Sequence, residues 1–463
     1  MKTTLRRILF TAAAGLLAAA VVIAVLLIPR PTPAGPSAPL SSHALGQPAY
    51  PQFPQQPVFD ETNVDWEKYN QQMNAYYDAL FALRGDGPVS GQLGIALNRF
   101  AQQTAPGVLR DTGGKNAVYS PLSLWSALAM LARCAEGESR QQVLDALGVD
   151  SAEQADELVS ELWRKLYTDD GLSSLIFANS IWLNSSMEGS YVQETVDALA
   201  QKHYAGSFAV PMGTPDADRA VSDWTAEQTR GLIGGDQPVT QTKEETLALL
   251  LSSLYYKAAW WDKFHPSANT TDTFTAADGS KTDATFMHRS ENSGFIRTED
   301  YQAAWLPTQL GAVTFVLPSE GIAPEELAAR PGFWAGLDRS AEHGEELLHG
   351  KIQWSVPKFD ADSRLNLMDT LADLGITQVT DPNKADLSAI SSLPAYVSNV
   401  EQLGRIKVDE EGVEAAAVTV ITMDATAAPM EPDQVCVMDL DRPFLFAIYH
   451  EGIPLFTGIV NEV

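Results

Sequence analysis

The stretch that is most informative about function is residues 409–434, in which a run of acids leads into Gly412. Small and β-branched residues follow, and over 413–423 they alternate between the two faces of a strand. One of these faces carries no charge, and the other carries only Glu414. Such a segment fits between two buried strands, although its proline-containing far end is typical of an exposed loop. A segment that fits both states indicates a conformational switch.

Motifs for catalysis or metal binding are missing from the chain. It contains no GxSxG, no phosphate-binding glycine loop and no paired catalytic histidine. Its histidines are scattered, without an HExxH or CxxC-type cluster. Two cysteines, Cys134 and Cys436, are too few for a disulfide framework, and Cys134 lies in an apolar helical run where a buried thiol is expected. We therefore expect no enzymatic activity, no metal and no cofactor.

Composition restricts the class of protein. With 463 residues, 45% of them apolar and 19% charged, the chain can form one large or two ordinary globular domains. The net charge is -28, from 31 basic and 59 acidic residues. Nothing supplies a basic face that could neutralise phosphates, so nucleic acid is not an expected partner. We expect a soluble monomer.

The amino terminus carries an export signal. Basic residues precede an uncharged apolar stretch at 8–28, which is long enough to span a bilayer. Cleavage of residues 1–28 as a signal peptide and their retention as a membrane anchor both remain open. In either case the rest of the chain is expected to be extracellular, with the membrane contacted only through this segment. Residues 29–58 are rich in proline and predict a disordered linker.

The globular part begins after this linker. Aromatic and apolar residues recur at helical spacing between Asn63 and Leu83, so we expect residues 59–88 to form an amphipathic helical extension. In the main domain, residues 89–463, helices and strands follow one another without regular alternation. That order favours an α+β fold over a doubly wound α/β fold. The expected helices lie at 120–135, 141–147 and 365–374, and the expected strands at 175–183, 247–257, 313–317 and 352–356.

Several separated blocks of residues carry a family resemblance. They occur in register at 116–123, 178–182, 254–257, 356–359, 374–377, 385–388, 408–417 and 442–446. Among them are the sequences NAVYSPLS, ANSIW and VDEEGVEAAA. On these blocks the chain resembles the serpin family over about residues 89–463, which is nearly the whole globular part.

The resemblance implies a fold of three β-sheets and about nine helices, with a reactive loop at about 412–434 that is offered to a protease. A serpin inhibits serine proteases as a suicide substrate. The protease cleaves the loop, and the amino-terminal part of the loop then inserts into the central sheet as a new strand. Insertion adds hydrogen bonds at roughly 1 kcal/mol net each. The uncleaved state is therefore kinetically trapped, and cleavage releases the stored energy.

The hinge before the loop decides whether insertion is fast. By the resemblance, the hinge consists of Glu410, Gly412, Val413, Glu414, Ala415, Ala416 and Ala417. The alanines are small enough to enter the sheet, and Val413 is apolar where a charge would obstruct the first step. We therefore expect an inhibitor. The alternative is a non-inhibitory binding or carrier protein displayed at the cell surface, although the hinge of such a protein usually contains charges or prolines.

The resemblance also assigns residues that control opening of the sheet. They are Ser120, Ser123, Ser252, Gln402, Lys358 and Trp260. Ser252 stands where an asparagine is common and Gln402 where a histidine is common, so we expect a hydrogen-bonded network with changed geometry and without a titrating group. At the other end of the sheet, Lys358 is the expected ion partner of Glu410, with Trp260 packed beside it. An ordinary surface ion pair that contributes little is the alternative.

The residues around the reactive bond predict the class of protease. By the family's spacing from the hinge glycine, the bond falls at Thr426–Ala427, and Met430–Glu431 is a rival. The neighbouring side chains are small, without Arg, Lys or an aromatic ring. A trypsin-like pocket needs a cation and a chymotrypsin-like pocket needs a large ring. Elastase-like serine proteases are therefore the expected partners, and subtilisin-like enzymes come second.

Overall fold

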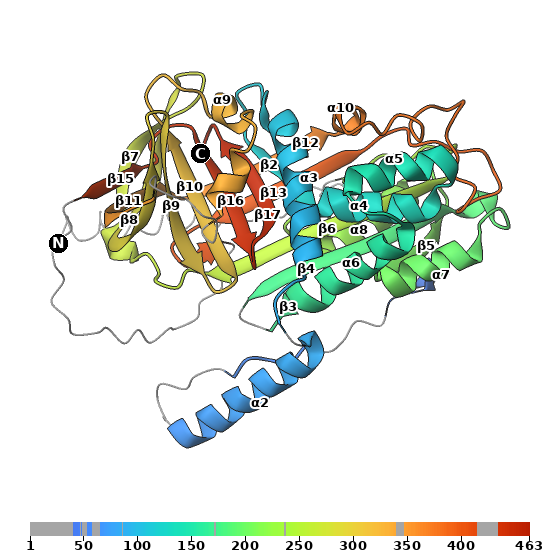
Figure 1. The fold of residues 1–463 in the computed structure, drawn as a ribbon, viewed down its shortest axis with the longest axis horizontal. Coiled ribbons are helices and arrows are strands. Elements are labelled where there is room, and N and C mark those ends of the chain that lie inside the picture. The colour runs from blue at the N-terminus through green and yellow to red at the C-terminus, as the bar shows by residue number, and fades with distance from the viewer. Residues whose placement is uncertain are drawn as a thin grey trace, which may run out of the picture. The chain divides into compact units, whose positions relative to one another are not determined.

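The computed structural model describes residues 40–46, 48, 53–57, 65–85, 87–170, 173–235, 238–338, 347–413 and 434–463. Two compact units divide the chain, residues 1–42 and residues 43–463. The described part of the first unit is a single 3-10 turn, η1 (Leu40–Ser42). The other elements belong to the second unit (Figure 1).

A sheet of eight strands within these ranges contains the predicted hinge. In spatial order its strands are β1 (Ala44–Gly46), β5 (Ala205–Val210), β4 (Ser174–Asn184), β6 (Ala248–Ala259), β14 (Gly412–Val413), β13 (Glu401–Val408) and β12 (Phe359–Asn366), and β3 (Thr168–Asp169) pairs with β4. We call it the central sheet. Strand β4 is buried along its whole length, which explains why its sequence is not an alternating polar and apolar pattern.

The nine remaining strands of the described chain form a second hydrogen-bonded set. In spatial order they are β15 (Val435–Asp439), β11 (Leu347–Pro357), β8 (Lys281–Arg297), β9 (Tyr301–Thr308), β10 (Gly311–Pro318), β16 (Phe444–His450), β17 (Ile453–Val460) and β2 (Ala117–Tyr119), with β7 (Thr270–Thr275) paired to β8. Strand β8 joins two groups in this set, because it pairs with β7 over Lys281–Phe286 and with β11 over Phe286–Ile296 but meets β9 only over its last residues, Phe295–Arg297. These two groups and the central sheet are the three predicted sheets.

Nine α-helices lie in the ranges given above. They are α2 (Trp66–Arg84), α3 (Gly91–Leu109), α4 (Pro121–Cys134), α5 (Gly137–Leu147), α6 (Ala152–Leu166), α7 (Gln193–Lys202), α8 (Pro215–Gln228), α9 (Pro324–Ala328) and α10 (Met368–Asp373). Figure 1 shows α4, α5 and α6 stacked together along β4 and β6. The predicted α+β fold class is confirmed.

Helix α4 is the buried support of the central sheet. Ser120 caps it, because the Ser120 hydroxyl accepts a hydrogen bond from the backbone N–H of Ser123 at 3.2 Å, and Pro121 occupies the first helical position. All but two of its residues are buried, and Trp125 among them is fully buried. Packing on every side therefore fixes the position of Ser120.

One predicted helix is shorter than its sequence pattern indicates. Residues 365–374 are expected to be helical, whereas β12 extends to Asn366 and only α10 is helical. Leu365 pairs with Gln402 of β13, so the first residues of the apolar run belong to a strand of the central sheet. Local helical spacing does not reveal this competition, because the partner strand lies further along the chain.

The extension before the main domain contains helix α2, which begins at a capped residue. The Asp65 side chain accepts a hydrogen bond from the backbone N–H of Lys68 at 3.0 Å. Further along the helix, the Tyr76 hydroxyl donates to Asp170 at 3.2 Å. This buried contact fastens α2 to the segment before β4.

Three predictions concern membrane contact, metal binding and cysteines. No helix among the described residues is long and apolar enough to cross a membrane, and the apolar stretch at 8–28 lies outside them. The same residues contain no group of three His, Cys, Asp or Glu side chains placed to hold a metal ion. Cys134 and Cys436 are buried free thiols, which confirms the prediction made for Cys134.

Candidate functional site

Strand β14 lies between β6 and β13 at one end of the central sheet. Val413 pairs with Ala258 of β6 and with Val408 of β13, and Gly412 pairs with Ala259. Both pairings are antiparallel, so β6 and β13 run parallel to each other. The start of the predicted reactive loop is therefore already paired with two strands.

Beyond β14, no strand of the described chain pairs with the facing edges of β6 and β13. On its other edge β6 pairs with β4 over 248–257, and β13 pairs with β12 over 401–408. We call the region between these facing edges the central gap. Because its two sides do not pair with each other in the described ranges, their backbone groups can bind one more strand.

Gly412 and Val413 fit closely at the entrance of the central gap. A Cβ atom on Gly412 would lie 2.2 Å from the backbone oxygen of Ala258, so a larger residue would displace β6. The Val413 side chain is only 2% exposed. A charged side chain at position 413 would have to be desolvated there without a partner.

Trp260 binds the backbone of the acids before the hinge. Its indole N–H donates to the carbonyl oxygen of Asp409 at 2.9 Å, and its backbone N–H donates to the carbonyl oxygen of Glu411 at 3.0 Å. The backbone N–H of Phe264 donates to the carbonyl oxygen of Glu410 at 3.2 Å. Trp260 thus contacts the residues on either side of Glu410 in the predicted hinge, and its role in sheet opening stays a prediction.

The Glu410 carboxylate is held by two side chains. Lys358 Nζ lies 2.8 Å from Glu410 Oε2, and Asn269 Nδ2 donates to Glu410 Oε1 at 2.6 Å. Burial acts to raise the pKa of Glu410, but the hydrogen bonds from Lys358, the backbone and Asn269 outweigh burial and lower the pKa below its ordinary value. Lys263 forms a second ion pair with Glu411 at 2.6 Å. The predicted partner of Glu410 is in place.

Further down the central gap, Gln402 binds α4 at two points. The backbone N–H of Ser120 donates to Gln402 Oε1 at 2.7 Å, and Gln402 Nε2 donates to the carbonyl oxygen of Ser120 at 2.9 Å. The amide side chain thus forms hydrogen bonds with both the backbone N–H and the backbone carbonyl of Ser120, the residue that caps α4. Ser123 joins this site through its backbone bond to the Ser120 hydroxyl.

Ser252 is not part of this network. Ser252 lies at the same level of the central gap as Gln402. Val413 pairs with Ala258 of β6 and with Val408 of β13, and Ser252 precedes Ala258 by as many residues as Gln402 precedes Val408. The Ser252 hydroxyl is buried and has no hydrogen-bond partner among the described residues. The structure therefore brings Ser120, Ser123 and Gln402 together without Ser252.

The remaining predicted site residues lie outside the described ranges. They are Glu414, Ala415, Ala416, Ala417, Thr426, Ala427, Met430 and Glu431. Their roles as hinge and reactive bond stay predictions.

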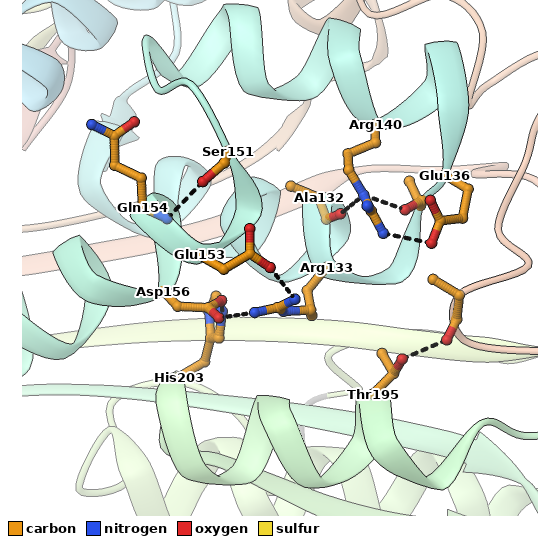
Figure 2. Close-up of polar contacts among 12 residues, drawn as sticks. Ala132, Arg133, Glu136, Arg140, Ser151, Glu153, Gln154, Asp156, Thr195 and His203 are labelled. Carbon is orange, nitrogen blue, oxygen red and sulfur yellow. Dashed lines mark hydrogen bonds and ion pairs between the residues drawn. The ribbon is translucent and has the colours of Figure 1, made fainter.

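Sequence reasoning missed a buried charged cluster among the helices that pack beside β4 (Figure 2). Arg133 of α4 forms an ion pair with Asp156 of α6, and Asp156 Oδ1 lies 2.8 Å from Nε2 of the fully buried His203. Burial acts to raise the pKa of Asp156, but hydrogen bonds from His203 and Arg133 lower it overall. The available signal was Asp156 itself, an acid on the apolar face of α6. Asn269 was also missed, since no local pattern marks it.

The chain is similar to known proteins over this whole region. A family model described as Serpin (serine protease inhibitor) matches residues 95–463. Serpin-ZXA of Oryza sativa subsp. japonica is 29% identical over 396 residues, which cover 81% of this chain and 97% of the relative. A serine protease inhibitor of Cyanea capillata is 28% identical over 377 residues, covering 78% and 93%. The crystal structure of the thermophilic serpin tengpin in the native state, 25% identical, superposes with a TM-score of 0.69 over 82% of this chain and 96% of that one.

Proposed function

The chain belongs to the serpin family, and on that premise we propose that it inhibits serine proteases by inserting its cleaved reactive loop into the central gap. Members of the family are generally protease inhibitors. The observation that carries the insertion step is β14, where Gly412 already pairs with β6 and Val413 pairs with both β6 and β13. Residues 414 and beyond would continue this strand after cleavage.

Cleavage is required because the loop is held at both ends. Its amino-terminal end is β14 in the central sheet, and its carboxyl-terminal end leads into β15, which pairs with β11 in the other set of strands. Cutting the loop frees the segment after Val413 to enter the central gap. Each hydrogen bond gained with β6 or β13 contributes roughly 1 kcal/mol net, so a full strand makes insertion strongly favourable. The uncleaved state is then a kinetic trap.

The register of β14 predicts which residues would meet in the inserted state. If the strand continues without a bulge, Thr419 comes directly between Ser252 and Gln402, because the pairings of Val413 fix every later position. Residues directly opposite in a sheet share a face, so all three side chains would lie together. The Thr419 hydroxyl would supply a partner for the Ser252 hydroxyl, which has none among the described residues.

The proposed target is an elastase-like serine protease, with a subtilisin-like enzyme as the second choice. Small side chains at Thr426–Ala427 fit a shallow specificity pocket better than a deep one. The rival bond Met430–Glu431 presents an unbranched apolar side chain that such a pocket also accepts. Either bond therefore predicts the same class of protease, although the two bonds place the cleavage at different positions.

We place the inhibitor outside the cell. Residues 1–28 would direct export and then be removed or stay as an anchor, and the linker at 29–58 would separate the inhibitor from the membrane. Residues 59–88 form the helical extension and 89–463 the inhibitory domain. A protease that approaches from the medium would then meet the loop without a further transport step.

The test is reaction of the full chain with elastase and, separately, with subtilisin. We expect an SDS-resistant adduct with elastase, and mass spectrometry of the released carboxyl-terminal fragment is expected to show a new amino terminus at Ala427. A terminus at Glu431 would keep the mechanism and move the bond. Complete loop cleavage without an adduct by either enzyme would contradict inhibition and favour a binding or carrier protein.

A further inference from the structure

Part of the chain before α2 lies against one edge of the central sheet. Strand β1 pairs antiparallel with β5, and beside this pairing the His43 carbonyl accepts a hydrogen bond from the Ala209 N–H at 2.8 Å. Further along, the backbone N–H of Gln56 donates to the Asp170 carbonyl, just before β4, at 3.2 Å. We call the described residues within 43–57 the strap. The strap is thus hydrogen-bonded to the main domain near both of its ends.

An aromatic side chain fastens the strap between these two points. The Phe53 ring lies 4.8 Å from the ring of Tyr167 and 6.1 Å from that of Trp163, between centroids, at the end of α6. Trp163 in turn stacks on Tyr204, the residue before β5, at 4.5 Å. Phe53 is partly buried against the core by this packing. Because such ring contacts add to the burial of apolar area, Phe53 is the main apolar attachment of the strap.

The strands at the two ends of the central sheet differ in how they resist pairing with another chain. Strand β12 has the sequence FDADSRLN, with charges at Asp360, Asp362 and Arg364. Strand β5 has the sequence AGSFAV, which contains no charge and no proline, and all of its residues except Ala209 are buried. Charges protect an outer strand, whereas an uncharged apolar one is a template for a further strand. Of these two strands, β5 is the one that β1 covers.

We infer that the strap is an edge cover, which occupies the outer edge of β5 and so prevents a second copy of this chain from pairing with the central sheet. The competing occupant is the β5 strand of that second copy. Two identical outer strands can pair antiparallel about a two-fold axis, so each copy would satisfy the backbone groups that the other exposes. This inference concerns self-association and does not depend on the proposed inhibition of proteases.

The test loosens the strap with Phe53→Ser in the full chain, kept in a mild detergent that covers the apolar stretch 8–28. At nanomolar concentration, the amides on the outer edge of β5 should exchange with deuterium roughly tenfold faster than in the wild type, as expected for the loss of an aromatic contact. Mass spectrometry of the fragments that contain β5 measures this rate. At micromolar concentration the variant should dimerise, which sedimentation velocity measures. Its association constant should rise by roughly a hundredfold, the square of the first factor, because both copies must release their straps.

A matched control and a rescue separate the edge cover from general destabilisation. Phe81→Ser removes a phenylalanine that is 61% exposed on α2, outside the strap, and should keep the wild-type exchange and stay monomeric. Adding Ala209→Lys to Phe53→Ser gives β5 a charge of the kind that β12 has, and should abolish the dimer while the strap stays loose. A synthetic peptide with the sequence of residues 43–57 should also return Phe53→Ser to the monomer by binding the outer edge of β5.

Three results would overturn the inference. Wild-type exchange of β5 in Phe53→Ser would show that this ring does not fasten the strap. A monomeric Phe53→Ser chain with fast exchange would show that the outer edge of β5 does not attract a second copy. A dimer that persists after Ala209→Lys is added would place the interface elsewhere. None of these measurements uses a protease, so a missing elastase adduct would reject the proposed function and leave the edge cover standing.

Discussion

At the end of the central gap where β14 enters, the backbone of residues 409–411 is bound, whereas further down no strand of the described chain lies between the two sides of the gap. Glu410 is paired with Lys358, and its neighbours are held by Trp260. At the lower level, Gln402 binds the backbone of α4, and the Ser252 hydroxyl has no partner in the described chain. Under the proposed mechanism, one end holds the segment that would move, and the other holds the strands that would receive it.

If the proposed insertion takes place, the two ends of the central gap contribute to it in different ways. Contacts at the entrance hold residues 409–411 beside β14, so losing them would loosen the predicted hinge. Further down, the contact of Gln402 with Ser120 holds one side of the central gap in place. The Ser252 hydroxyl, which has no partner among the described residues, belongs to neither group. It is a cost of the uncleaved state that an inserted strand could remove.

The largest effect is expected from Val413→Arg at the entrance. The side chain at this position is 2% exposed between β6 and β13, and a guanidinium buried there without a partner costs several kcal/mol. Insertion should stall at its first residue, and the variant should be cleaved as a substrate without an adduct. SDS gels with elastase measure the ratio of adduct to cleaved chain.

Val413→Thr is the matched control, because it keeps the shape of valine and adds no charge. It should still form the adduct. An adduct of normal yield with Val413→Arg would show that insertion does not begin at β14 and would remove the distinction between the two ends of the gap.

A smaller effect is expected from Thr419→Val at the lower level. If Thr419 is the inserted partner of Ser252, the cleaved protein should lose about 1 kcal/mol of unfolding free energy, and the uncleaved protein should lose none. Denaturant unfolding of both forms measures the difference. Adding Ser252→Ala to Thr419→Val should restore most of the loss, since no hydroxyl is then left unpaired. Equal losses in the two forms would contradict the register.

The smallest effect is expected from Glu410→Gln at the entrance. Because the pKa of Glu410 is lowered in the folded protein, its stabilising contribution is present above its ordinary value of 4.5 and is lost as the pH falls through the lowered value. At neutral pH the variant should melt about 1–2 °C below the wild type, since the partner Lys358 is partly exposed. The difference should disappear in acid. A difference that stays constant with pH would show that this ion pair contributes nothing.

The fold was accessible from the sequence, and the hinge could be predicted from it, because both predictions depend on local patterns. The alternation after Gly412, the charge-free face and the family blocks are visible without knowledge of distant contacts. The pairing of Lys358 with Glu410 also followed, since the resemblance names both residues. The contact of Gln402 with Ser120 did not follow, because a flexible amide has several possible partners until the backbone places one within reach.

The boundary of α10 shows the same limit on a smaller scale. The apolar run at 365–374 fits a helix, and only the pairing of Leu365 with Gln402 assigns its first residues to β12. Arg133, Asp156 and His203 likewise lie far apart in the sequence and meet only when α4, α6 and the end of α7 pack together.

By itself, the sequence determined the family, the fold class and the small, uncharged side chains around the predicted reactive bond, because each of these can be read from short blocks of neighbouring residues. The tertiary structure alone decided that β14 lies between β6 and β13, that Gln402 turns to α4, and that Ser252 is left without a partner in the described chain. These outcomes depend on which buried groups of distant segments come within hydrogen-bond distance, and that is fixed only when the whole domain is packed.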